Sequence, residues 1–157
     1  MNAAAAVILD LSPDDATLRW RDAQGKAQVH ALPIGPERLA RQHRFGRPAS
    51  PLALEAAIET VEDAVMPLAA GLPRPAELWL GAGTGALAAG IGAAGDVLDI
   101  DTVEAAFARL ADLALGRPAA QAGVPDDAGF AAALLVLREA MHHLGLRAAR
   151  LGIPPAA

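Results

Sequence analysis

The chain has 157 residues, enough for one domain with a sizeable core, and we expect a single α/β domain over 1–157. Its formal net charge of −5 argues against a nucleic-acid partner. Because cysteine is absent, disulfides, thiolate metal sites and cysteine nucleophiles are excluded. No apolar run approaches the roughly 20 residues that a membrane span needs, and the N-terminus lacks the basic start of a signal peptide. We therefore expect a cytoplasmic protein with no membrane partner.

The first third of the chain predicts three strands joined by short turns. Residues 5–9 form an apolar run that ends at Asp10, and residues 16–21 and 27–32 alternate between two faces. Turn-forming residues fill the gaps, Ser-Pro-Asp-Asp in the first and Asp-Ala-Gln-Gly in the second. Three strands with such short connections predict an antiparallel meander.

Helices and short strands alternate in the rest of the chain. Ser50 followed by proline predicts a helix start, after which apolar residues recur every three or four positions to Leu68. Asp101 with a glutamate three residues on resembles a capping box, and the last helix ends at Gly145. This order of elements predicts an α/β fold with a mixed sheet. The sheet consists of an antiparallel meander plus parallel strands, with helices on its faces. Further helices are expected at about 37–43, 84–91, 101–114 and 127–144, buried or short strands at 78–80 and 96–100, and a strand or tail at 146–153.

A glycine-rich turn lies between the short apolar strand and an alanine-rich helix. Glycine lets a backbone or a phosphate come close, and a helix start offers free N–H groups to an anion. Gly81, Gly83, Thr84 and Gly85 are therefore candidates for binding a phosphate-containing ligand or cofactor. The alternative is that they only allow tight packing of the strand against the helix.

The same turn, Gly81–Gly85, resembles motif I of class I methyltransferases, which is Gly-x-Gly-x-Gly after a strand. Residues 97–101 resemble the second strand of those enzymes, whose final acid binds the ribose of S-adenosylmethionine. The resemblance implies Asp99 or Asp101 as a cofactor ligand. However, the 56 residues after Asp101 contain one candidate strand, and a methyltransferase sheet needs several more βα units there.

Three stretches resemble the second lobe of exopolyphosphatase and guanosine pentaphosphate phosphatase proteins. Residues 7–12 resemble the lobe's first strand and acidic phosphate turn, residues 32–39 resemble its Leu-Pro-x-Gly-x-x-Arg-Leu segment, and residues 78–87 resemble its strand and Gly-Gly-Thr loop. These proteins share the ribonuclease-H-like fold of actin, sugar kinases and the heat-shock ATPases. The resemblance implies that fold and a phosphate ligand, with Asp10 as the candidate catalytic residue that holds Mg²⁺ or orients a water. It places the family's own catalytic acid in the other lobe.

The turn after Asp10 departs from the family pattern. The family reads Asp-x-Gly-Gly-Gly-Ser, whereas Leu-Ser-Pro-Asp follows Asp10 here. Pro13 has no N–H group to offer, and Asp14 and Asp15 would repel a phosphate. Family members also close two lobes on the substrate, and this length holds one. We therefore expect a degenerate, non-catalytic lobe that binds a partner protein or an anionic small molecule.

Two alternative functions stay open: a phosphate-ester hydrolase that uses Asp10, and a methyltransferase that uses Gly81–Gly85. The apolar stripes of the last two helices exceed what one small sheet can cover, so we also expect a homodimer. His142 and His143 are adjacent on a helix and point about 100° apart, which argues against a metal-binding pair.

Overall fold

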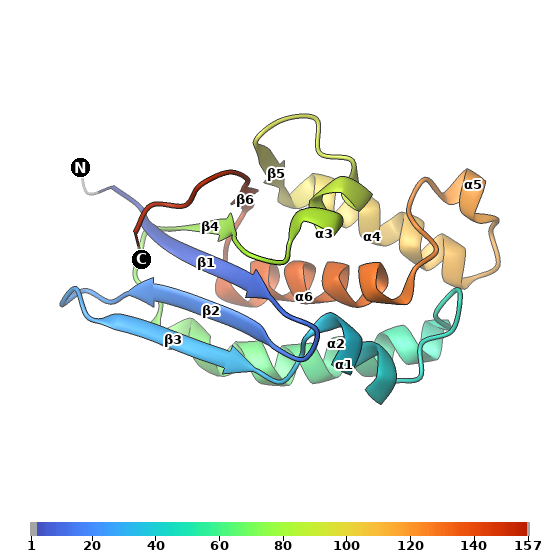
Figure 1. Ribbon diagram of the computed structural model, residues 1–157, viewed down its shortest axis with the longest axis horizontal. Coiled ribbons are helices and arrows are strands. Elements are labelled where there is room, and N and C mark those ends of the chain that lie inside the picture. The colour runs from blue at the N-terminus through green and yellow to red at the C-terminus, as the bar shows by residue number, and fades with distance from the viewer. Residues whose placement is uncertain (1–2, 157) are drawn as a thin grey trace.

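The computed structural model describes residues 3–156, so the outermost limits of the expected domain, 1 and 157, lie outside the described residues. Six strands form one mixed sheet in the order β3-β2-β1-β4-β6-β5 (Figure 1). The antiparallel meander consists of β1 (Ala5–Leu11), β2 (Ala16–Arg21) and β3 (Ala27–Leu32).

The second half of the sheet contains the parallel strands. β4 (Ala76–Leu80) pairs parallel to β1, and β6 (Ala148–Arg150) pairs parallel to β4. β5 (Val97–Asp99) closes this edge and runs antiparallel to β6. The expected fold class, α/β with an antiparallel meander plus parallel strands, is confirmed, and the undecided segment after residue 146 contains a strand.

The helices follow local signals in the sequence. Ser50 caps the helix with the longest predicted apolar stripe, as expected. Its hydroxyl accepts a hydrogen bond from the Ala53 N–H at 3.1 Å. Asp127 caps the last helix, and Gly145 ends it with a positive φ of 65°. In chain order the helices are α1 (Pro36–Gln42), α2 (Pro51–Val65), the 3₁₀ helix η1 (Met66–Gly71), α3 (Gly85–Ile91), α4 (Ile100–Ala114), α5 (Ala119–Ala122) and α6 (Ala128–Leu144).

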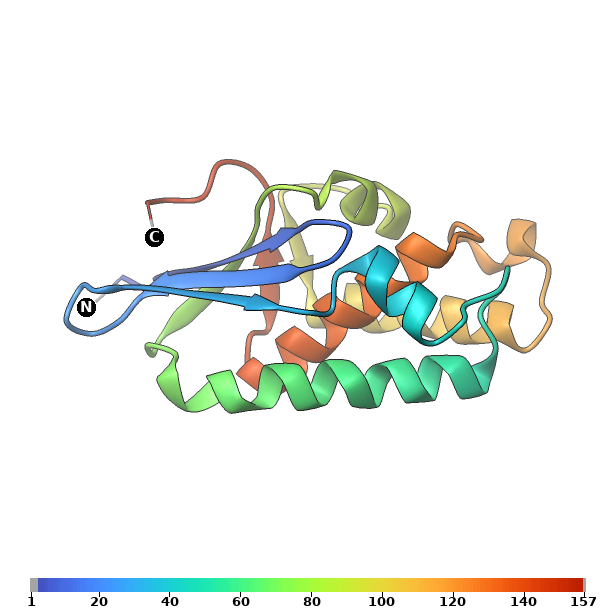
Figure 2. The same ribbon diagram turned by 60° about the horizontal axis from the view of Figure 1, so that its bottom comes forward.

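The core is built around α6, which is buried on most of its surface. It contacts α1, α2, α3, α4 and η1, and Figure 2 shows α2 and α6 side by side beneath the sheet. Successive positions on a helix point in different directions, and yet Leu134, Leu135 and Leu137 are all fully buried. Neighbouring elements therefore cover more than one side of α6. The stripe of the last helix is therefore covered within one chain. The homodimer expected from uncovered stripes lacks this support, and it stays a prediction.

The alternating apolar side chains of β2 lie on the sheet face toward these helices. Leu18 and Trp20 of β2 are buried there, and His30 of β3 stacks on the Trp20 ring with 4.9 Å between the ring centres. β4 is central, as predicted, but it is not buried on both faces. Trp79 is half-buried on the opposite face, where the Arg150 guanidinium lies 5.9 Å from the centre of its ring.

Two local predictions about helices are wrong. α4 begins at Ile100, and its cap is Asp99 rather than Asp101, because the Asp99 carboxylate accepts the Thr102 N–H at 2.8 Å. Glu104, the other half of the predicted capping box, instead pairs with Arg138 of α6. The short helix α5, which follows Gly116, is absent from the predicted helices.

Among residues 3–156, no helix is both long enough and apolar enough to cross a lipid bilayer.

Candidate functional site at the ends of β1 and β4

The sequence-predicted residues Asp10, Gly81, Gly83, Thr84 and Gly85 come together where β1 and β4 end. The two strands are parallel neighbours, with Leu9 opposite Leu80, so their carboxyl ends meet at one edge of the sheet. In open α/β sheets this edge is where ligands commonly bind.

Both carboxylate oxygens of Asp10 already have partners inside the protein. Oδ2 accepts the Arg19 Nε–H at 2.8 Å, and Oδ1 accepts the backbone N–H of Ala82 at 2.7 Å. Arg19 lies on β2, Asp10 on β1, and Ala82 in the turn after β4. The Asp10 carboxylate therefore links three neighbouring segments at this edge.

The turn after Asp10 is closed by its own hydrogen bonds. The Ser12 N–H donates to the Asp15 carbonyl at 2.9 Å, and the Asp15 N–H donates to the Ser12 hydroxyl at 3.1 Å. Pro13 has no N–H, and its carbonyl accepts the N–H groups of Glu37 and Arg38. These contacts hold α1 against the turn. A turn that binds phosphate needs several free N–H groups pointing to one place. Here the N–H groups of Ser12 and Asp15 are bonded within the turn, and Pro13 has none.

The glycines of the second turn allow it to approach β1 closely. A side chain at Gly81 would place its Cβ 2.1 Å from Oδ1 of Asp10, and one at Gly83 would place it 1.8 Å from the Leu11 carbonyl oxygen. Gly83 also has a positive φ of 75°. Thr84 is buried, and its hydroxyl donates to the Gly81 carbonyl at 2.6 Å. Tight packing therefore accounts for these three residues.

Gly85 differs from its neighbours, because nothing lies within 4 Å of the Cβ that it lacks. It is the first residue of α3, which has only seven residues. Space for an approaching group therefore exists at Gly85 but not at Gly81 or Gly83.

Asp99 is not brought to this edge. β5 runs antiparallel to β6, and β6 runs parallel to β4, so the carboxyl end of β5 lies at the opposite end of the strands from Gly81–Gly85. β6 also lies between β4 and β5 in the sheet. The Asp99 carboxylate accepts hydrogen bonds from Thr102, and these hold the pKa of Asp99 below its usual range. The bond from the Thr102 side chain has the larger effect, and the bond from its backbone N–H the smaller. The arrangement expected of a methyltransferase, with Asp99 beside the glycine turn, does not form.

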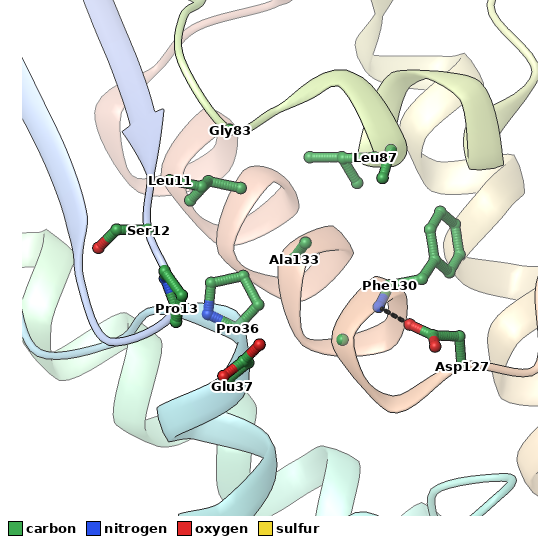
Figure 3. A pocket seen from close by; sticks show the side chains of 12 residues that line it. Leu11, Ser12, Pro13, Pro36, Glu37, Gly83, Leu87, Asp127, Phe130 and Ala133 are labelled. Carbon is green, nitrogen blue, oxygen red and sulfur yellow. Dashed lines mark hydrogen bonds between the residues drawn. The ribbon is translucent and has the colours of Figure 1, made fainter.

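A cavity of about 340 Å³ opens beside the two turns, between α1, α3 and the start of α6 (Figure 3). Most of its wall is apolar, and the charged residues that line it are Glu37 and Asp127. Asp127 also accepts the Phe130 N–H at 2.7 Å, drawn as a dashed line in Figure 3. Among the described residues that form the wall, none is a lysine or arginine. Its lining is Leu11, Ser12, Pro13, Pro36, Glu37, Gly83, Ala86, Leu87, Asp127, Gly129, Phe130 and Ala133.

Sequence reasoning missed a second group of ligand-type side chains, formed by Glu62 of α2 with Glu139 and His143 of α6. Their ligand atoms all lie within 4.8 Å of one another. Glu139 and His143 are four positions apart, so they share one helix face, and this spacing was the available signal. The expectation about the adjacent histidines agrees with the contacts: His142 meets Glu104 of α4, and His143 meets Glu139.

No model of a known protein family matches the chain, and no curated protein matches it either. Solved structures do match. The Aquifex aeolicus Ppx/GppA phosphatase, type II variant, superposes with a TM-score of 0.72 at 16% identity, covering 96% of this chain and 54% of its own. An exopolyphosphatase from Cytophaga hutchinsonii gives a TM-score of 0.70 at 14% identity, with 98% and 55% covered. The chain thus spans about half the length of these proteins and has the fold of a single lobe of them.

The glycine turn yields a first prediction with a matched control. Gly83→Ala places a Cβ against the Leu11 carbonyl at a positive φ, so we expect it to lower the free energy of unfolding by more than about 2 kcal/mol. Gly85→Ala meets open space at a helical position and should be neutral or stabilising by about 0.4–1 kcal/mol. Urea unfolding of both variants measures this. Equal effects of the two substitutions would contradict the close approach of the turn to β1.

The cap of α4 yields a pH-dependent prediction. Because the pKa of Asp99 is lowered in the folded state, its stabilising effect is complete above the usual carboxyl pKa and is lost as the pH falls through the lowered value. Asp99→Ala should therefore lower the melting temperature at pH 7, and the difference from wild type should shrink between about pH 5 and pH 2. Asp101→Ala is the control, since Asp101 does not cap the helix. A larger loss in Asp101→Ala would restore the cap expected from the sequence.

Proposed function

We propose that the protein is a non-catalytic exopolyphosphatase-like domain, folded as one unit, that acts by binding a partner protein. The observation that carries this proposal is the engagement of Asp10. Its two carboxylate oxygens are bonded to Arg19 and to the Ala82 N–H, so the side chain that would hold Mg²⁺ serves instead to join β2, β1 and the turn after β4. The Arg19 guanidinium already compensates the negative charge that would attract a cation to this carboxylate.

The surroundings of Asp10 also oppose phosphate binding. The N–H groups of Ser12 and Asp15 are bonded within the turn, and Pro13 has none. The cavity beside the turn is lined by two carboxylates and otherwise by apolar or small side chains. A phosphate placed there would lose water and meet negative charge, with no guanidinium or ammonium group in the wall to compensate. We therefore favour the partner protein over the anionic small molecule that the sequence left open.

The same cavity has the chemistry of a protein-binding pocket. The largely buried Leu87 and Phe130 form part of its apolar wall, and Glu37 and Asp127 add negative charge (Figure 3). A complementary partner presents a large apolar side chain next to a lysine or arginine. We propose that such a segment of a partner protein occupies this cavity.

The two enzyme alternatives have less support. Hydrolysis would require Asp10 to bind a metal ion next to the Arg19 guanidinium that already pairs with it, and the two cations would repel each other. A methyltransferase would require Asp99 beside Gly81–Gly85 and several strands after Asp101, whereas the described residues after Asp101 contain β6 alone.

Asp10→Asn tests the non-catalytic part of the proposal. We expect purified wild-type protein with Mg²⁺ or Mn²⁺ to release no phosphate from polyphosphate above the blank. Asp10→Asn should lower the free energy of unfolding by about 1.5–3 kcal/mol, because it weakens charge-assisted bonds to Arg19 and Ala82. Asp14→Asn is the control in the same turn, where the carboxylate is half-exposed, and it should cost less than about 1 kcal/mol. Metal-dependent phosphate release that Asp10→Asn abolishes without a loss of stability would overturn the proposal.

A peptide selection tests the binding part. Peptides selected from a random library on the wild-type protein should be enriched in a basic residue next to a large apolar one. Ala86 is exposed and lines the cavity, so Ala86→Arg should weaken their binding at least about tenfold by filling the cavity and reversing its charge. Ala89→Arg, on the same helix but outside the cavity wall, should leave it unchanged. Selection of acidic peptides, or equal loss in both variants, would count against this cavity as the binding site.

A further inference from the structure

Three side chains with metal-ligand atoms converge between α2 and α6, away from the cavity described above. The Nε2 atom of His143 lies 3.1 Å from an oxygen of Glu139 and 3.7 Å from an oxygen of Glu62. All three ligand atoms fall within 4.8 Å of one another. One nitrogen and two oxygens from two helices therefore face a common point.

These separations match the spacing of ligands around a small tetrahedral ion. Nitrogen and oxygen ligands at 2.0–2.1 Å from Zn²⁺ lie about 3.3 Å from each other in a tetrahedron. The two separations that involve His143 lie on either side of this value. The third separation, between the Glu62 and Glu139 oxygens, is within 4.8 Å, so side-chain rotation on a fixed backbone would bring these two oxygens closer around an ion.

The central ligand, Glu139, is held in place by a further charged residue. Its side chain is only 6% exposed, and Arg138 binds Oε1 at 2.8 Å, which leaves Oε2 directed at His143. Arg138 in turn is fixed by Glu104 and lies over the Phe107 ring. A ligating carboxylate whose second oxygen is bound and oriented in this way is typical of metal sites in proteins.

The charge of the cluster also favours a cation. Three carboxylates and one guanidinium lie in this cluster: Arg138 pairs with Glu104 and Glu139, and Glu62 lies near His143. The carboxylates outnumber the guanidinium by two, and negative charges without cationic partners in a partly buried place are costly. A divalent ion would neutralise them.

We propose that Glu62, Glu139 and His143 bind a divalent transition-metal ion of the Zn²⁺ class, with water as the fourth ligand. A mixed nitrogen and oxygen set suits Zn²⁺ or Co²⁺, whereas Mg²⁺ and Ca²⁺ prefer oxygen ligands alone. Glu62 is 40% and His143 24% exposed, so the ion can enter from solvent on this side. The bound ion would tie α2 to α6. This inference is independent of the proposed function, because it involves none of the residues at the β1 and β4 edge.

Metal titration of the full chain tests the site. After treatment with a chelator, isothermal titration with Zn²⁺ should show one saturable site per chain, and Zn²⁺ should raise the melting temperature by mass action. Co²⁺ should produce the intense visible absorption of a tetrahedral complex, which a structural hydrogen bond between His143 and Glu139 alone would not. Mg²⁺ at the same concentration should produce no shift.

Variants identify the ligands. Glu62→Gln and His143→Gln should each weaken Zn²⁺ binding at least about tenfold and abolish the Co²⁺ spectrum, whereas His142→Gln, the adjacent histidine that meets Glu104, should retain both. Circular dichroism and melting of the metal-free variants establish that each is folded. Absence of saturable Zn²⁺ binding by folded wild-type protein would overturn the proposal. So would binding that survives both ligand variants or is lost in His142→Gln. Phosphatase assays would be unaffected by either result, so the two proposals fail separately.

Discussion

The burial of α6 is the constraint on which the arrangement of this protein depends. The helix is apolar around most of its circumference, and it lies under the sheet with α1, α2, α3 and α4 packed around it. A helix of this kind cannot face water on any broad side, so each neighbouring element is positioned by the surface it covers. Both candidate sites lie on this helix. Its first turn forms part of the apolar cavity, and its last turns carry Glu139 and His143.

At the carboxyl ends of β1 and β4, residue types associated with phosphate chemistry serve packing instead. Asp10 joins three segments, and Gly81 and Gly83 let the turn after β4 lie against β1. These roles compete with ligand binding, because the charge of Asp10 is already compensated by Arg19 and the glycine turn is pressed against a neighbouring strand. On the function proposed here, the chain has the fold of a phosphatase lobe and an acid at the end of its first strand, but it does not bind phosphate there.

Local sequence signals were accurate wherever the cause of the structure was local. The cap at Ser50, the end of α6 at Gly145 and the alternation of β2 each depend on neighbouring residues, so they could be predicted within a residue or two. The cap of α4 was misplaced because Asp99 and Asp101 are both acceptable at a helix start. The choice between them was made when Asp99 became the last residue of β5, paired with Ala148 of β6. That pairing joins residues nearly fifty positions apart, which no local pattern reveals.

The sequence by itself determined the mixed sheet, the approximate limits of most helices and the resemblance of three stretches to a phosphatase lobe, because periodicity and turn chemistry act over short distances. It also brought forward Asp10 and the Gly81–Gly85 turn as the residues to consider. Only the tertiary structure decided what they do. The direction of β5 separated Asp99 from the glycine turn, and Arg19 formed an ion pair with Asp10. Helix packing brought Glu62 close to Glu139 and His143. The physical reason is the same in each case: whether a polar side chain is available to bind a ligand depends on the partners that folding brings from far along the chain.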